Sequence, residues 1–112
     1  MIEMADGWIK LHRKIADWEW YRDANTMRLF VHLLLLASRG DGREWLGSPL
    51  PPGHVVASYW AFAANLGLTE KMVRVAFGKL ESTGEISLVS RCRHGSVWRI
   101  SNWGAYQVPG DA

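Results

Sequence analysis

The chain of 112 residues has a single cysteine, Cys92, and no long apolar run. One cysteine excludes an internal disulfide and a four-cysteine zinc site. No apolar run approaches the roughly 20 residues that a membrane-spanning helix needs. The N-terminus carries Glu3 and Asp6 and no basic-then-apolar leader, so we expect no signal peptide. These absences favour a reducing compartment, no contact with a membrane, and a cytoplasmic location.

The sequence also lacks a pattern that would support catalysis or cofactor binding. Cys92 and His94 form a Cys-x-His pair, but the other histidines are scattered, and zinc needs more ligands at suitable spacing. The glycines between residues 40 and 47 are not followed by the Gly-Lys-Ser/Thr of a phosphate loop. Asp17 and Glu19 have no partner residues for general acid–base catalysis. We therefore expect no enzyme, no metal and no cofactor.

Tryptophan and positive charge are distributed unevenly along this chain. Seven tryptophans in a chain of this size must be packed for the most part. We expect a buried frame of Trp8, Trp18, Trp20, Trp103 and Tyr106. The formal net charge is only +2, but residues 69–99 hold six basic and three acidic residues, whereas residues 1–68 hold seven of each. The positive surplus therefore lies in one segment.

The length and the globular composition fit one domain over residues 1–112, with an ordered core over 7–107 and flexible ends. The segment 8–21 is compatible with a short helix and with extended chain. Asn25 predicts the N-cap of a mostly buried helix over 26–38. Short strands are expected at 43–46 and 54–57. The segment 47–53 between them is expected to be a loop, since three prolines cannot continue a helix or a central strand.

Residues 58–84 are typical of a helix-turn-helix. Ser58 is a good N-cap for a helix over 59–66, which Gly67 ends. Thr69 caps a second helix, which runs to about residue 82 and ends at Thr83-Gly84. A helix, a three-residue turn with glycine and a second helix form the helix-turn-helix signature.

The second helix has an apolar face and an opposite face of small and basic residues. The core stripe consists of Val73, Ala76, Phe77 and Leu80. The opposite face carries Lys71, Val75, Gly78 and Ser82, with Arg74 and Lys79 beside it. Small residues leave room for approach and cations attract phosphates, so this face suits a DNA groove.

Two alternating runs follow, at 86–89 and 97–100, and they predict a β-hairpin. The connection over 90–96 carries Arg91, Arg93 and His94 at its tip. A hairpin directly after a helix-turn-helix is a wing, and the strand at 54–57 is placed to add a third strand. The expected fold class is therefore α+β, a winged helix-turn-helix with a small antiparallel sheet.

The functional hypothesis is non-catalytic, sequence-specific binding of double-stranded DNA. In the major groove we expect Lys71, Arg74, Val75, Gly78 and Lys79. From the wing, Arg91, Arg93 and His94 are expected to contact the backbone or minor groove. Ser58 and Thr69 are expected to donate to phosphates as well as to cap. Five neutralised phosphates would give a slope of log affinity against log salt of about −4 to −5.

An alternative hypothesis starts from Tyr59 and Trp60, which begin the first helix of the motif. That helix contains no basic residue. Its two aromatics suit a surface that binds a host or replication protein, so that the chain would act as a small phage-type inhibitor or adaptor. Helix-turn-helix proteins often pair to read two half-sites, and the sequence is compatible with a homodimer.

Four blocks of sequence resemble one family. They are GWIKLHRKI and WEWY at 7–21, TMRLFVHLLL at 26–35, LGLTEKMVR and KLESTGEI at 66–86, and ISNWGAYQ at 100–107. Together they resemble the N-terminal winged-helix domain of phage and prophage replisome organisers, the DnaD-like replication initiators.

The resemblance implies origin binding and a part in phage DNA replication, inside a bacterial cell or an infected bacterium. In the family a linker and a second domain usually follow, so we expect either an excised domain or a small stand-alone protein. The family's first motif helix is usually polar and basic near its start, and here Tyr59, Trp60 and Ala61 stand there.

Overall fold

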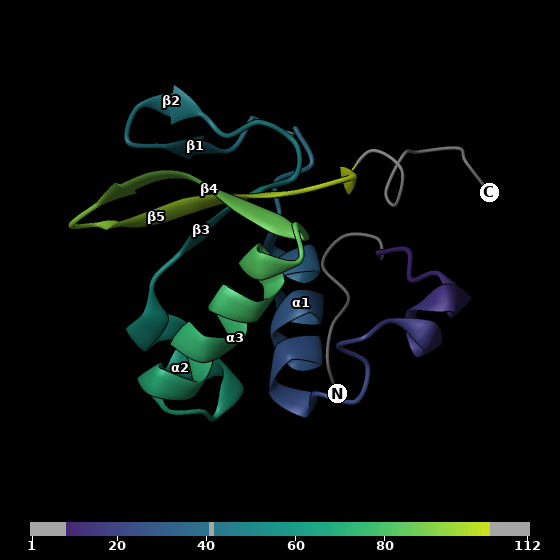
Figure 1. Cartoon of the computed structure of the whole chain (residues 1–112). Coiled ribbons are helices and arrows are strands. Elements are labelled where there is room, and N and C mark those ends of the chain that lie inside the picture. The colour runs from purple at the N-terminus through teal and green to yellow at the C-terminus, as the bar shows by residue number, and fades with distance from the viewer. Residues whose placement is uncertain (1–8, 41, 104–112) are drawn as a thin grey trace, which may run out of the picture.

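The computed structural model describes residues 9–40 and 42–103, which form three α-helices and two small antiparallel sheets, of three and two strands (Figure 1). The helical elements are the 3₁₀ helix η1 (Arg13–Asp17), α1 (Ala24–Leu36), α2 (Tyr59–Leu66) and α3 (Glu70–Ser82). The strands are β1 (Glu44–Trp45), β2 (Ser48–Pro49), β3 (His54–Ala57), β4 (Ile86–Cys92) and β5 (Gly95–Ile100). The predictions for Trp8, Tyr106, the block over 104–107 and the flexible ends lie outside the described residues. No helix in the described part is long and apolar enough to span a membrane.

Helix α1 begins earlier than the sequence suggested. Asp23 is the N-cap, and its carboxylate accepts a hydrogen bond of 3.2 Å from the backbone N–H of Thr26. The prediction of Asn25 as the cap was wrong, because Asn25 lies inside the helix. A carboxylate at this position also interacts favourably with the helix dipole. The helix ends at Leu36 rather than Ser38, and it buries Leu29 and Leu33 completely.

Helices α2 and α3 have the predicted bounds. Gly67 ends α2 in the left-handed conformation, with φ of 69°. Thr69 caps α3 by accepting a hydrogen bond of 3.1 Å from the N–H of Met72. Ser58 stands at the N-cap position of α2, but its side chain makes no capping hydrogen bond. The predicted core stripe of α3 is confirmed, since all four of its side chains are buried.

The larger sheet has the strand order β3-β5-β4, all antiparallel, so the predicted third strand is confirmed. The expected connection over 90–96 was too long. The strands continue to Cys92 and restart at Gly95, and only Arg93 and His94 lie between them. Leu88 pairs with Trp98 and Ser90 pairs with Val97, which leaves Val89 as an extra residue in a β-bulge.

The segment expected to be a loop contains the two-residue strand β2, which pairs with β1. Leu46 and Gly47 connect the strands with φ values of 52° and 81°, and positive φ is what a tight two-residue hairpin turn requires. Pro49 is tolerated because this small hairpin is all edge, so its missing N–H removes no bond of a central strand. The hairpin lies on one side of the larger sheet and the helices lie on the other (Figure 1).

The core lies between the helices and the larger sheet. Phe77 is at its centre, with its ring centroid 5.3 Å from Tyr59, 5.8 Å from Phe62 and 5.0 Å from Trp98. Burial of such rings dominates the stability of a small domain. Of the expected tryptophan frame, Trp18, Trp20 and Trp103 pack partly buried against this core.

The segment before α1 is a short 3₁₀ helix followed by turns, and two indoles attach it to the end of α3. The Nε1 of Trp18 donates to Glu85 at 3.1 Å, and the Nε1 of Trp20 donates to Thr83 at 3.0 Å. Contacts from residues this distant in sequence, rather than local periodicity, determine its course.

Candidate nucleic-acid interface

A depression of about 430 Å³ lies where the start of α2, the middle of α3 and the tip of the β4–β5 hairpin meet. We call it the arginine depression. Its lining includes the predicted site residues Ser58, Tyr59, Trp60, Arg74, Arg91, Arg93 and His94. Among the described residues that line it, none is acidic. The structure thus brings together the predicted wing cations, one predicted cation of α3 and both predicted aromatics of α2.

Arg74 is held in place by an aromatic ring. Its guanidinium carbon lies 4.8 Å from the centroid of the Tyr59 ring. Tyr59 itself packs edge-on against Phe77 in the core. A cation over an aromatic face is attracted to it, so the core orients Tyr59 and Tyr59 orients Arg74. The guanidinium remains exposed and is available to an anion.

Arg91 reaches the same depression because of the bulge at Val89. Cross-strand partners point to one face of a sheet, and successive residues alternate between faces. Trp98 faces the helices and packs on Phe77, so Ser96 faces them as well. Arg91 pairs with Ser96 and therefore points toward the helices.

A regular ladder would reverse this arrangement. Continued from the pair of Leu88 and Trp98, it would place Ser90 opposite Ser96 and direct Arg91 to the other side of the sheet. The bulge thus aims Arg91 at the depression. The sequence contains no signal for it, since Val89 fits a regular alternating strand.

The exposed face of α3 adjoins the depression through Arg74. Lys71, Val75 and Gly78 are exposed, as the sequence predicted. A β-carbon placed on Gly78 would meet nothing within 4 Å, so this part of the helix is open to close approach. Two acidic residues, Glu70 and Glu81, stand near the ends of the same helix.

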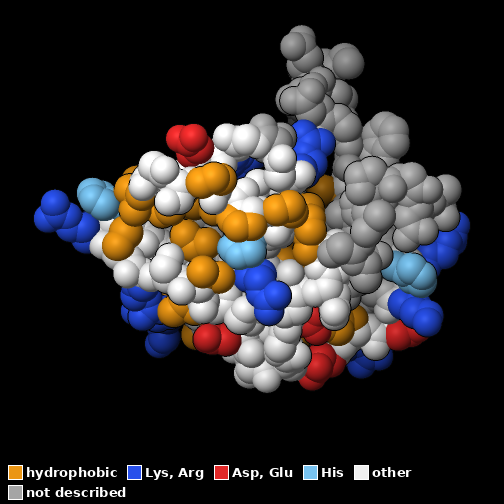
Figure 2. Space-filling view, turned by 90° about the horizontal axis from the view of Figure 1, so that it is seen from above, with side chains coloured by type: hydrophobic (Ala, Val, Ile, Leu, Met, Phe, Trp, Pro, Cys, Tyr) orange, Lys and Arg blue, Asp and Glu red, His pale blue; other side chains and the backbone are white. Residues whose placement is uncertain are grey.

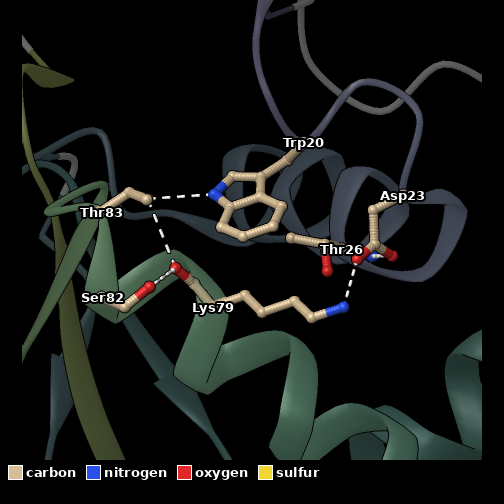
Figure 3. A network of polar contacts seen from close by, with 6 residues as sticks. All are labelled: Trp20, Asp23, Thr26, Lys79, Ser82 and Thr83. Atoms are coloured by element: carbon tan, nitrogen blue, oxygen red, sulfur yellow. Dashed lines mark hydrogen bonds and ion pairs between the residues drawn. The ribbon is translucent and has the colours of Figure 1, made fainter.

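Lys79 does not line the arginine depression, and its side chain points to the start of α1 instead (Figure 3). Its ammonium forms an ion pair with Asp23, the cap of α1, and lies 5.8 Å from the centroid of the Trp20 ring. The hydrogen bond from Lys79 is the main cause that holds the pKa of Asp23 below its ordinary value, and the N–H of Thr26 lowers it further, against the opposing effect of burial. Lys79 therefore joins α3 to α1.

The two predicted hydroxyl donors belong to different surfaces. Ser58 lines the arginine depression, and because it makes no capping bond its hydroxyl is available to a ligand. Thr69 lines a second, smaller depression between α3 and the start of α1, together with Lys71, Val75 and Lys79. The capping bond of Thr69 uses its oxygen as an acceptor and leaves its O–H to donate.

The two aromatics of α2 have different environments. Tyr59 is partly buried and in contact with Phe77 and Arg74. Trp60 is 69% exposed at the rim of the depression. Figure 2 shows Lys and Arg side chains at the end to which the β4–β5 hairpin points, beside a hydrophobic area on the face above the sheet.

No group of three or more His, Cys, Asp or Glu residues in the described part of the chain could hold a metal ion. Comparisons with protein-family models, with curated proteins and with solved structures find no match. The resemblance to replication initiators therefore rests on the four blocks of sequence and stays a prediction.

Proposed function

We propose that the protein is a non-catalytic winged-helix protein that binds duplex DNA. In this proposal α3 enters the major groove, and the β4–β5 hairpin is the wing. The observation that carries it is the convergence of Arg74, Arg91 and Arg93, from two separate elements, on one depression without an acidic lining residue, directly beside the exposed face of α3. Closely placed cations of this kind match a phosphate backbone.

In this proposal the positions of the side chains separate phosphate contacts from base contacts. Arg91, Arg93 and Ser58 would hold phosphates and so set the position of the protein on the duplex. Lys71 and Val75, on the open face of α3, would reach base edges, because Gly78 leaves room for the helix to approach. The four sequence blocks support a more specific role in this proposal, origin binding or regulation in phage replication within the bacterial cytoplasm.

The test is fluorescence anisotropy with the full chain and labelled duplexes, one random and one resembling a phage origin, over a series of salt concentrations. Four exposed cations, namely Lys71, Arg74, Arg91 and Arg93, should give a slope of log affinity against log salt of about −3.6, at roughly 0.9 per neutralised phosphate. We expect micromolar or tighter binding that weakens steeply with salt. A slope near zero would refute the proposal.

A matched pair of double variants locates the contact. Arg91→Ala with Arg93→Ala removes two charges at the depression, and Arg13→Ala with Lys14→Ala removes two charges in η1, on the opposite side of the molecule in Figure 1. The first pair should lower the affinity strongly and reduce the slope by about 2, whereas the second pair should leave both nearly unchanged. Equal losses in the two variants would point to non-specific attraction only.

A second candidate function is supported by the exposed indole of Trp60. An aromatic of this kind is a frequent anchor of protein interfaces, which fits an inhibitor or adaptor that binds a host protein. Such binding would be insensitive to salt. It would be lost in Trp60→Ala and retained when Arg91 and Arg93 are both replaced by alanine.

A further inference from the structure

Trp60 is the most exposed of the large hydrophobic side chains in the described residues. Nothing in the core requires an indole at this place, because its neighbour Tyr59 makes the ring contact with Phe77. Among the described residues Trp60 takes part in no ring contact, so its indole is free to receive a ligand. It stands at the rim of a concave site that also presents three arginines.

We propose that the arginine depression binds one unpaired nucleotide, with its base stacked on Trp60 and its flanking phosphates held by Arg74, Arg91 and Arg93. This inference rests on the proposed function and narrows its ligand to DNA that contains an unpaired segment. A nucleotide supplies both chemistries that the depression offers, an anion for the guanidinium groups and a flat aromatic face for the indole.

Intact duplex can bind the arginines of this site but cannot stack on Trp60. Its phosphates can reach the arginines, but its bases are stacked inside the helix and present only their edges in the grooves. An unpaired base has a free face, and base–aromatic stacking does not depend strongly on which base is present. The depression also has room for a base, since about 430 Å³ falls in the roughly 300–1,000 Å³ range of small-ligand pockets.

The geometry assigns separate parts to the two aromatics. Tyr59 is partly buried against the core and carries Arg74 over its ring, so it positions a cation. Trp60 is the next residue on the helix and therefore points in a different direction, roughly 100° away. One residue thus orients the phosphate contact and the other provides the stacking surface.

The test compares two labelled DNAs in the anisotropy assay, an intact duplex and the same duplex with a short single-stranded gap in one strand. We expect the wild-type chain to bind the gapped DNA more tightly. Trp60→Ala should weaken binding to the gapped DNA by about 5- to 150-fold, the range that loss of one base–aromatic stack gives, and should change binding to the intact duplex little. Trp60→Phe should retain most of the preference, because phenylalanine keeps a stacking face.

Tyr21→Ala is the matched control, since Tyr21 is another exposed aromatic and does not line the depression. It should leave both affinities unchanged. Circular dichroism and thermal melting establish that each variant is folded, which we expect because both side chains are exposed.

Equal affinity of the wild type for the two DNAs would overturn the inference while leaving the proposed function intact. The same holds if Trp60→Ala weakens both DNAs to the same degree. Absence of binding to either DNA at low salt would refute the proposed function itself, and the inference with it.

Discussion

Replacing Lys79 tests whether this residue contributes to stability or to the proposed DNA binding, because the sequence and the structure assign it different roles. By its place on α3 it belongs to the predicted DNA-binding cations. In the structure its ammonium pairs with Asp23 and lies near the Trp20 ring (Figure 3). We therefore expect Lys79→Met to weaken the attachment of α3 to α1 and to leave DNA binding largely unchanged.

The magnitude follows from the exposure of the pair. The side chains of Lys79 and Asp23 are 40% and 25% exposed, so solvent screens their attraction. A partly exposed ion pair together with a cation–aromatic contact stabilises by about 1 kcal/mol in total. A loss of that size lowers Tm by roughly 4 °C in a chain of 112 residues, since the entropy of unfolding is about 2.1 cal/mol/K per residue. Methionine retains the apolar stem, so the loss reports mainly on the charge.

Lys71→Met is the matched control, since Lys71 is an exposed lysine on the same helix. It should leave Tm nearly unchanged and reduce the salt slope of duplex binding by about 0.9, whereas Lys79→Met should lower Tm and leave the slope as it is. Thermal melting followed by circular dichroism, and anisotropy over a salt series, measure the two quantities. A slope reduced by about 0.9 at constant Tm in Lys79→Met would show that Lys79 leaves Asp23 to bind phosphate and does not join α3 to α1.

The same pair makes a pH prediction. Lys79 holds the pKa of Asp23 below its ordinary value of 3.8, so the ion pair's stabilisation is present above that pH and is lost as the pH falls through the lowered pKa. The difference in Tm between the wild type and Lys79→Met should therefore be constant near neutral pH and shrink in strong acid. A difference that persists in strong acid would assign the effect to packing instead of charge.

Two further predictions concern His32 and the hairpin. Burial, with a smaller effect of the Arg28 charge, lowers the pKa of His32 below 6.5. As the pH falls, the imidazole is therefore protonated in the unfolded chain before it is protonated in the folded one, and stability decreases below about pH 6.5. His32→Phe should remove that part of the pH dependence of Tm. Exchanging Ser90 and Arg91 conserves composition and charge but moves the guanidinium to the face of Val97, away from the depression, and we expect DNA affinity to fall as far as in Arg91→Ala. Unchanged affinity in the exchange variant would show that the bulge does not decide which face the arginine occupies.

The region α2–turn–α3 could be predicted from the sequence because its determinants are local. Gly67 supplies a left-handed residue, Thr69 caps the next helix, and the apolar spacing of α3 marks its buried side. Each of these signals acts within a few residues of its own position. Because these signals all indicate the same helix ends, the bounds of α2 and α3 could be predicted closely.

The start of α1 depends on a contact across the fold and could not be found in this way. Asp23 and Asn25 are both good capping residues, so local preference does not choose between them. Asp23 also pairs with Lys79, which is distant in sequence, and this tertiary contact favours the earlier start. Strand β2 escaped prediction for a related reason, because Pro49 is excluded from a central strand and tolerated in an isolated edge hairpin.

The candidate site was predicted as a set of residues, but not as an arrangement. Basic residues on α3 and on the hairpin tip could be recognised from charge and spacing. The extra residue in β4 decides that Arg91 reaches the depression that Arg74 lines, and the ion pair with Asp23 keeps Lys79 at α1. Both depend on how strands and helices pair, which local sequence patterns do not reveal. Arg74 and Arg91 share a depression, whereas Lys79 is held elsewhere.

The two adjacent aromatics of α2 explain how the depression can have a fixed arginine and an exposed indole side by side. Residues that follow one another on a helix point about 100° apart, so a helix packed on a core can bury one and expose the next. Tyr59 contacts Phe77 and orients Arg74 through a cation–aromatic contact, which does not neutralise the charge of the guanidinium. Trp60 is left exposed beside the cations at the cost of contact between an indole and water. An apolar ring that large at an arginine-rich rim is stabilised when a ligand covers it, and a ligand that also carries negative charge satisfies both neighbours.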